Sequence, residues 1–198
     1  MIGRRLFALS AALALAACSH VPLGSILPLT RIKFGTTDIA RARAAVKLPD
    51  SLRPRVGGVR MSVIMGLSGE PPQSQKFDLV EAHDPEDQVT LAAFASAGSA
   101  VYAYRLAPDD VARLERMRAD MIERAAVLKQ EGKNPGSNLA INIGAEEFCH
   151  ARDLGSEPLL TTTYIKTSET GQYITALRDV DLRLEPAVKD KIGTMPPC

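Results

Sequence analysis

The sequence predicts an α+β fold, a two-layer sandwich in which one antiparallel or mixed sheet carries two main helices on one face. Three observations lead to this prediction. Apolar residues alternate with other residues over 61–67, as in a strand with one buried face. They recur at spacings of three and four over 108–130, as in an amphipathic helix. The expected element order, β-α-β-β, a variable piece and then β-α-β-β-β, is compatible with a duplicated βαββ unit, although the two halves share no residue-level similarity.

The N-terminal half of the fold is expected to contain one helix and three strands. Thr37 or Asp38 can cap the helix, and Pro49 stops it. Proline and glycine mark the loop and the turn between the strands. The expected elements are a strand over 30–34, a helix over 39–46, a loop over 50–58, and strands over 61–67 and 75–82.

The C-terminal half contains the clearest single element, the helix over 108–130. Pro108 suits its first turn, and Asp109 and Asp110 favour the positive end of the helix dipole. The hairpin at the end of the chain is rich in Thr, Tyr, Ile and Val, the residues that favour strands. The expected elements are a short helix within 89–97, strands over 100–106 and 139–143, with the latter extending toward Cys149, and a hairpin of 159–167 with 172–184.

Composition excludes two classes of protein. The chain has 198 residues, with 24 Lys and Arg against 23 Asp and Glu. A charge so close to zero lacks the basic footprint of a protein that binds nucleic acid. The hydrophobic fraction of 45% is too high for a disordered chain. The length fits one domain.

The N-terminus carries a targeting signal. Arg4 and Arg5 precede an apolar run over 6–17, which is too short to span a bilayer. The run ends in Leu15-Ala16-Ala17-Cys18, which resembles the bacterial lipoprotein signal peptide. That resemblance implies acylation of Cys18 and cleavage before it; the alternative is an ordinary signal peptide with an incidental cysteine. The expected division of the chain is a signal peptide over 1–17, a lipidated cysteine and short tether over 18–29, and one periplasmic domain over 30–198.

The same resemblance gives an expected location. Ser19 follows the acylated cysteine, and in this family serine there favours the outer membrane. The protein is therefore expected on the periplasmic face of the outer membrane, with the bilayer as a partner through acylated Cys18 and a membrane-proximal envelope protein as a second partner. Arg4-Arg5-Leu6-Phe7 also resembles the core of a twin-arginine signal, which leaves the export route open.

The other two cysteines, Cys149 and Cys198, form an even pair in an oxidising compartment, and a disulfide between them is expected. The chain-entropy model gives such a bond, closing a loop of roughly 50 residues, about 4 kcal/mol of stability. The alternative is a thiol nucleophile or a metal ligand at Cys149, beside His150.

Motifs for catalysis are absent from the sequence. It has no G-x-S-x-G elbow, no Ser-x-x-Lys motif and no glycine-rich phosphate loop. We therefore expect no catalytic residue, no cofactor and no metal site. The weak candidates for metal ligation are Glu81, His83 and Asp84. The competing interpretation is a solvated acidic turn, with Asp84 as a helix cap and Pro85 in the first helical position.

These observations favour a non-enzymatic lipoprotein that serves as an accessory or assembly subunit of a cell-envelope complex. A lipoprotein that binds a small or lipidic ligand is the alternative, and an apolar cavity would support it. A hydrolase or peptidoglycan enzyme is the third class, which the missing motifs disfavour.

Overall fold

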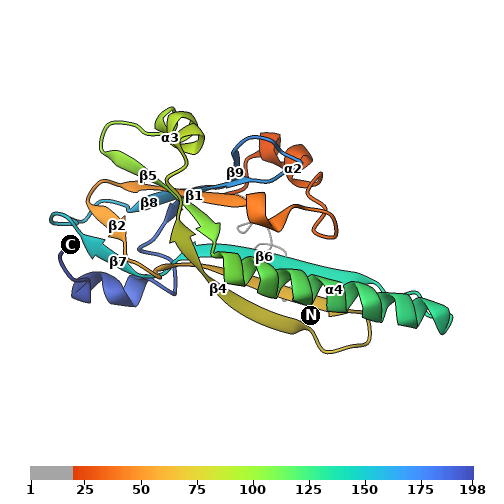
Figure 1. Ribbon diagram of the computed structural model, residues 1–198. Coiled ribbons are helices and arrows are strands. Elements are labelled where there is room, and N and C mark those ends of the chain that lie inside the picture. The colour runs from red at the N-terminus through yellow and green to blue at the C-terminus, as the bar shows by residue number, and fades with distance from the viewer. Residues whose placement is uncertain (1–19) are drawn as a thin grey trace, which may run out of the picture.

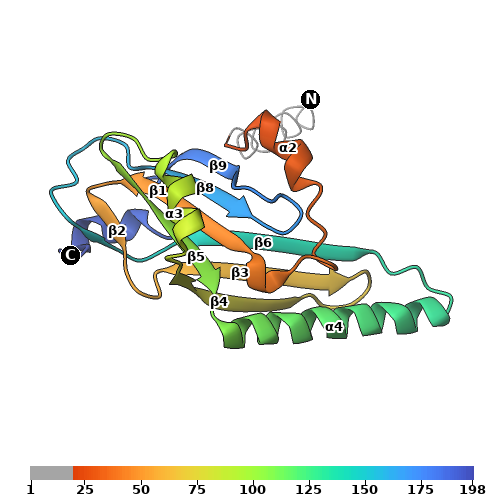
Figure 2. The same cartoon turned by 45° about the horizontal axis from the view of Figure 1, so that its top comes forward.

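The computed structural model describes residues 20–198. Its main feature is a curled antiparallel sheet of seven strands in the order β6-β3-β4-β5-β1-β8-β9, with a second sheet of β2 and β7 beside it (Figures 1 and 2). The α+β class and the antiparallel sheet are therefore confirmed. The strands are β1 Arg43–Pro49, β2 Leu52–Pro54, β3 Val59–Leu67, β4 Gln73–Glu81, β5 Ser99–Leu106, β6 Ser137–Ala145, β7 Phe148–His150, β8 Leu160–Lys166 and β9 Ile174–Asp181. The helices are α2 Leu23–Leu29, α3 Pro85–Ala92 and α4 Pro108–Gln130, with 3₁₀ helices η1 Ile39–Arg41 and η2 Lys189–Thr194.

The predicted helix over 39–46 is wrong, because only residues 39–41 form a short 3₁₀ helix, η1, and residues 43–46 belong to the interior strand β1. β1 pairs with β5 on one side and β8 on the other. Ala44 and Val46 face the larger core, whereas Ala45 faces the opposite side, so the strand is buried on both faces. A strand buried on both faces shows no period-two pattern, and pairing with two neighbours overrides the helix preference of alanine.

The two larger helices contact opposite faces of the sheet (Figure 1). Leu114 and Met117 of α4 belong to the core that includes Phe77 of β4, and Leu91 of α3 belongs to the smaller cluster on the other face. The expected layer of two helices on one face is not found. Since residues 43–46 belong to a strand and no α-helix forms over 39–46, the first half also lacks the βαββ order that suggested duplication.

Three other segments differ from expectation. Residues 30–34 form no strand, and residues 23–29 of the expected tether form α2, which lies against β9. The expected loop over 50–58 contains β2, which pairs with β7. The strand expected to reach Cys149 is interrupted after Ala145, and its last residues are the separate strand β7.

The remaining elements match the sequence pattern. β3, β4, β5, α4 and the hairpin of β8 and β9 occur where they were expected, and α3 is the short helix, although it begins at Pro85. α4 is amphipathic along its first half, where Leu114 and Met117 are buried. Its C-terminal half extends past the sheet (Figure 2), and Ile122 and Val127 there are about half exposed.

The predicted disulfide is present. Cys149 of β7 is bonded to Cys198, with Cα atoms 4.9 Å apart. The amide of His150 donates to the carbonyl of Pro196, and the amide of Cys198 donates to the carbonyl of His150. The bond and these contacts hold the C-terminal segment against β7, and this excludes free-thiol chemistry at Cys149 in this structure.

Candidate functional site: an apolar cavity

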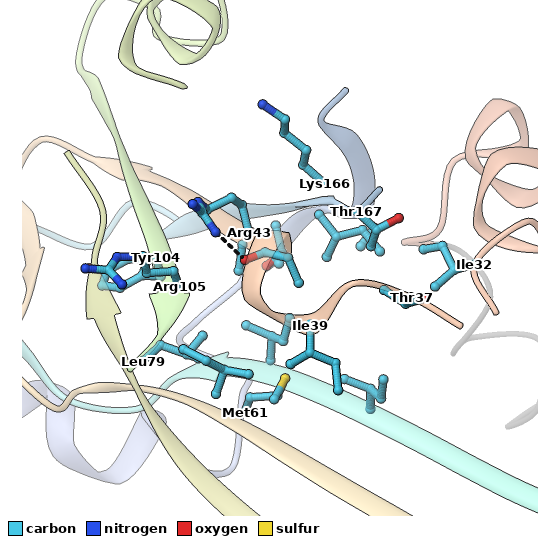
Figure 3. Close-up of a pocket in the computed structure, with 18 of the residues that line it drawn as sticks. Ile32, Thr37, Ile39, Arg43, Met61, Leu79, Tyr104, Arg105, Lys166 and Thr167 are labelled. Atoms are coloured by element: carbon cyan, nitrogen blue, oxygen red, sulfur yellow. Dashed lines mark hydrogen bonds between the residues drawn. The ribbon is translucent and has the colours of Figure 1, made fainter. Parts of the chain in front are cut away.

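A cavity of about 330 Å³ lies between the sheet, α4 and the segment before β1 (Figure 3). This volume is within the usual range for small-molecule sites. Most of the side chains around it are aliphatic or aromatic. The apolar members are Ile32, Phe34, Ile39, Ala42, Ala44, Met61, Leu79, Tyr104, Leu106, Leu114, Ile141, Ile143, Ile165, Ala176 and Leu177.

Both outer strands of the sheet contribute to the cavity. Ile141 and Ile143 come from β6, and Ala176 and Leu177 come from β9, at opposite ends of the strand order. The curl of the sheet therefore brings its two outer edges to the same cavity. The twist that all sheets have provides the basis for such a curl.

Residues 32–39, here called the strap, form the wall that spans the remaining side. Ile32, Phe34 and Ile39 line the cavity, and the strap connects α2 to β1 without forming a strand. Arg118 of α4 donates from Nη1 to the carbonyls of Thr37 at 2.7 Å and Phe34 at 3.2 Å. From the other side, Thr37 Oγ1 donates to Glu169 Oε1 at 2.7 Å. These side chains hold the strap over the cavity.

The charged residues of the lining do not place their charges in the cavity. Arg43, Arg105 and Lys166 are directed away from Ile39 and Met61 (Figure 3). Arg43 and Lys166 instead form ion pairs with Asp87. The interior of the cavity is therefore suited to an apolar group.

The only phenol in the lining is Tyr104, which is buried. Burial, together with the nearby charge of Glu81, raises the pKa of its hydroxyl. The phenol therefore stays protonated and neutral near neutral pH. Tyr104 therefore adds no charge to the lining.

The weak metal candidates do not form a metal site in the described part of the chain. Over residues 20–198, no group of three or more His, Cys, Asp and Glu side chains is arranged to hold a metal ion. Glu81 and His83 line a smaller cavity of about 250 Å³ beside α3, whereas Asp84 pairs with Arg43.

The competing interpretation, a solvated acidic turn, is only partly correct. Pro85 does begin α3, but the Asp84 side chain makes no capping hydrogen bond. Asp87 is 3% exposed, with Lys166 Nζ at 2.9 Å from Oδ1 and Arg43 Nε at 3.4 Å from Oδ2. Because these cations come from β8 and β1, no local pattern in the sequence could have indicated this cluster.

The expected lipidation site, Cys18, lies outside the described residues. The first described residue, His20, bonds to the edge of β9: the Arg178 amide donates to its carbonyl at 2.7 Å, and its Nδ1 donates to the Arg178 carbonyl at 3.0 Å. Between residues 20 and 198, the structure has no helix that is both long and apolar enough to cross a membrane.

Comparisons with known proteins give no further identification: no protein-family model, curated protein or solved structure matches this chain. The sequence and the apolar cavity are therefore the features from which a function can be inferred.

Proposed function

We propose that this protein is a lipoprotein of the cell envelope that binds an acyl chain, or an apolar ligand of similar shape, in the cavity between the sheet, α4 and the strap. The observation that carries the proposal is the cavity of about 330 Å³ with an apolar lining. In this proposal the protein binds and holds its ligand, and it needs no cofactor and catalyses no reaction.

The energetics favour a hydrocarbon chain as the occupant. Each methylene removed from water contributes about 0.8 kcal/mol, so burial of about eight methylenes gives roughly 6 kcal/mol before the cost of association. A charged head group would lose its hydration in the cavity and find no ionic partner there, because Arg43, Arg105 and Lys166 are directed away from its interior (Figure 3) and two of them pair with Asp87. The head group is therefore expected to stay outside.

The proposed anchor supplies both location and ligand source. The signal-peptide resemblance supports acylation at Cys18 and attachment to the periplasmic face of the outer membrane. Two residues of chain reach at most ~7 Å. Since His20 is bonded to Arg178, an acyl anchor two residues earlier in the chain would be attached within that reach of a residue held on the edge of β9. The cavity, which Ala176 and Leu177 of the same strand line, is thus held close to a membrane that contains acyl chains.

Titration with a fluorescent fatty acid tests the proposal. The wild-type protein is expected to bind the probe and to shift its emission. Ala176→Phe places a ring at the cavity wall and is expected to weaken binding about tenfold or more. Ala119→Phe, at an exposed position of α4 that does not line the cavity, is the matched control. Failure of the wild-type protein to bind, or equal binding by all three proteins, would contradict the proposed site.

A second candidate is the accessory or assembly subunit of an envelope complex. The observation in its favour is the exposed apolar surface on the C-terminal half of α4, which extends past the sheet. Ile122 and Val127 there are 50% and 49% exposed. A membrane-proximal partner could cover this surface. Crosslinking in intact cells from a photoreactive residue at Val127 tests this candidate, with Ala112 as the control position on the same helix. A crosslinked envelope protein specific to Val127 is the expected result.

A further inference from the structure

We infer that α2 inserts into the surface of the bilayer, so that Ile26 and Leu27 contact acyl chains and the basic residues Arg31 and Lys33 contact anionic lipid head groups. The occupant of this surface is the membrane itself. The inference rests on the proposed function for the location of the chain at a membrane. It concerns a different surface from the cavity, because none of the residues that line the cavity belongs to α2.

The burial pattern of α2 is the reverse of that expected for a helix packed on a water-soluble domain. α2 lies against β9, and its Ser25 is buried, at 7% exposure. Ile26 and Leu27 are 48% and 67% exposed. A surface helix normally buries its apolar side and turns its polar side to water. The apolar side chains of α2 are therefore placed where contact with hydrocarbon removes them from water.

The charges along this part of the chain suit an anionic membrane. Residues 21–30 contain no charged residue, and residues 20–37 contain no acid. Arg31 and Lys33 follow α2 and are exposed. The amide of Arg31 donates to the carbonyl of Pro28 at 3.1 Å, which keeps Arg31 beside the helix. Basic side chains in this position can extend from an inserted helix to the head groups, and each strengthens binding to an anionic surface about fivefold.

The proposed anchor is close to α2 along the chain. Leu23, where α2 begins, follows Cys18 by five residues, a stretch that reaches at most ~18 Å. His20, between them, is bonded to Arg178 on the edge of β9, and α2 lies against the same strand (Figures 1 and 2). Acylation at Cys18 would therefore hold α2 at a high local concentration of lipid. This allows a helix of only seven residues to insert.

Other exposed apolar residues lack the favourable charge that surrounds α2. Val89 is 77% exposed on α3, but it lies two residues after Asp87. Leu184 is 76% exposed, but Glu185 follows it directly. An anionic membrane repels these carboxylates. The combination of exposed apolar and nearby basic residues thus favours α2 as the side that meets the bilayer.

Insertion of α2 also orients the cavity. The strap begins at Ile32, three residues after α2 ends at Leu29, and Ile32 lines the cavity. A bilayer that holds α2 therefore lies beside the strap. The acyl chains that we propose as ligands would reach the cavity from the same surface.

Tryptophan quenching tests the insertion of α2. The chain has no Trp, so Leu27→Trp gives a single emission from the exposed side of the helix. The full chain is expressed, purified from membranes and reconstituted in vesicles of phosphatidylethanolamine and phosphatidylglycerol with brominated acyl chains. Bromine quenches only a Trp that reaches the acyl region, so most of the emission of Leu27→Trp is expected to be lost. Val56→Trp is the matched control and is expected to keep its emission, because Val56 is 104% exposed in the turn after β2, on the other side of the molecule from α2 (Figure 1).

The outcomes separate this inference from the proposed function. Equal quenching of both variants, or an unquenched Leu27→Trp, would overturn the insertion of α2; a protein partner that covers α2 would give the second result. The mass of each purified protein reports acylation of Cys18 independently, and a protein without acyl chains would contradict the proposed anchor instead. Circular dichroism establishes that the fold is retained. If Leu27→Trp does not fold, Ile26→Trp replaces it.

The head-group contact has its own test in the Leu27→Trp protein. Arg31→Gln/Lys33→Gln is expected to lower the ratio of inserted to free α2 about tenfold or more, as read from the quenched fraction of the emission. Lys189→Gln/Lys191→Gln is the matched control, because it removes two exposed cations at the same spacing from η2. Equal quenching in the two double variants would overturn the contact of Arg31 and Lys33 with the head groups.

Discussion

Ile141 and Leu177 lie on the two outermost strands of the seven-stranded sheet, yet both line one cavity. A flat sheet of this width would hold its edges far apart, since neighbouring strands are about 4.8 Å from each other. The curl brings the edges together, and the strap spans the gap between them. The strap is therefore the part of the wall that can move without breaking a strand pair.

Arg118→Met is expected to loosen the strap. The guanidinium donates to the carbonyls of Thr37 and Phe34, and both contacts disappear in the variant. Hydrogen bonds to charged groups contribute about 1.5–3 kcal/mol each. Hydrogen exchange should therefore accelerate over residues 34–39, and the fatty-acid probe should dissociate faster. Arg116→Met, at an exposed position of the same helix, should change neither rate. Unchanged exchange in Arg118→Met would show that Arg118 does not hold the strap.

The contact between Thr37 and Glu169 should make strap stability depend on pH. Partial burial acts to raise the pKa of Glu169, but hydrogen bonds from Thr37, Thr167 and Ser168 outweigh it, and the pKa is lowered. A carboxyl with a lowered pKa stabilises the folded state above its unfolded pKa of about 4.3, and this contribution is lost as the pH falls through the folded pKa. Glu169→Gln should therefore be less stable than wild type at pH 7.

The difference between the two proteins should shrink when denaturation is repeated at acidic pH, as the pH falls below about 4.3 and through the lowered folded-state pKa of Glu169, because the wild-type carboxyl then becomes protonated as well. The free energy of unfolding in urea at both pH values is the measurement. A difference that stays constant between neutral and acidic pH would mean that the charge of Glu169 does not contribute.

The accuracy of sequence-based prediction varied with how each element is buried. β3 and α4 each bury one side, so their sequences show periods of two and 3.6, and both were predicted. β1 is buried on both faces and shows no period, so it was mistaken for a helix. The disulfide was predictable without knowledge of the fold, because two of the three cysteines remain once Cys18 is set aside as the expected lipidation site.

The candidate site could not be predicted in the same way. Its lining comes from the strap, from all seven strands of the sheet and from α4, and each element contributes only one to four residues. Ala176, for example, lines the cavity because the sheet curls, and no local pattern in the sequence indicates that curl. The sequence does show that the nine residues of β6 carry no charge. It does not show that β6 lies at an edge of the sheet, because that position depends on the strand order.

Asp87→Asn is expected to destabilise the protein by about 3 kcal/mol, because it leaves two cations without their buried partner. Asp87 lies within 2.9 Å of Lys166 and within 3.4 Å of Arg43, and its side chain is 5% exposed. Asp84→Asn is the matched control. Asp84 also pairs with Arg43, but its side chain is 52% exposed, and the expected cost is below about 1 kcal/mol. Urea denaturation of both variants measures the difference. Equal costs would show that burial does not determine the contribution of this cluster.

Cys18→Ala is expected to release the protein from the membrane or to leave an uncleaved precursor. Acyl chains provide the proposed attachment, and two or more of them make it stable. Fractionation of cells, together with the mass of the protein, measures both outcomes. A processed Cys18→Ala protein that remains tightly bound to the membrane would contradict lipidation. His83→Ala serves as a control, since His83 has no proposed role in attachment.

Loss of the disulfide is expected to lower stability by about 4 kcal/mol, the chain-entropy value for the loop of 49 residues that it closes. The loss should also free the C-terminal segment, because the bond keeps the amide of Cys198 on the carbonyl of His150. Val188, which belongs to the core, would then lose part of its support.

The double variant Cys149→Ser/Cys198→Ser removes the disulfide without leaving an unpaired thiol. Its unfolding in urea, compared with that of reduced wild type, should give the same free energy, because both lack the same link. Free thiols at both positions in protein taken from the periplasm would instead show that the bond does not form in the cell.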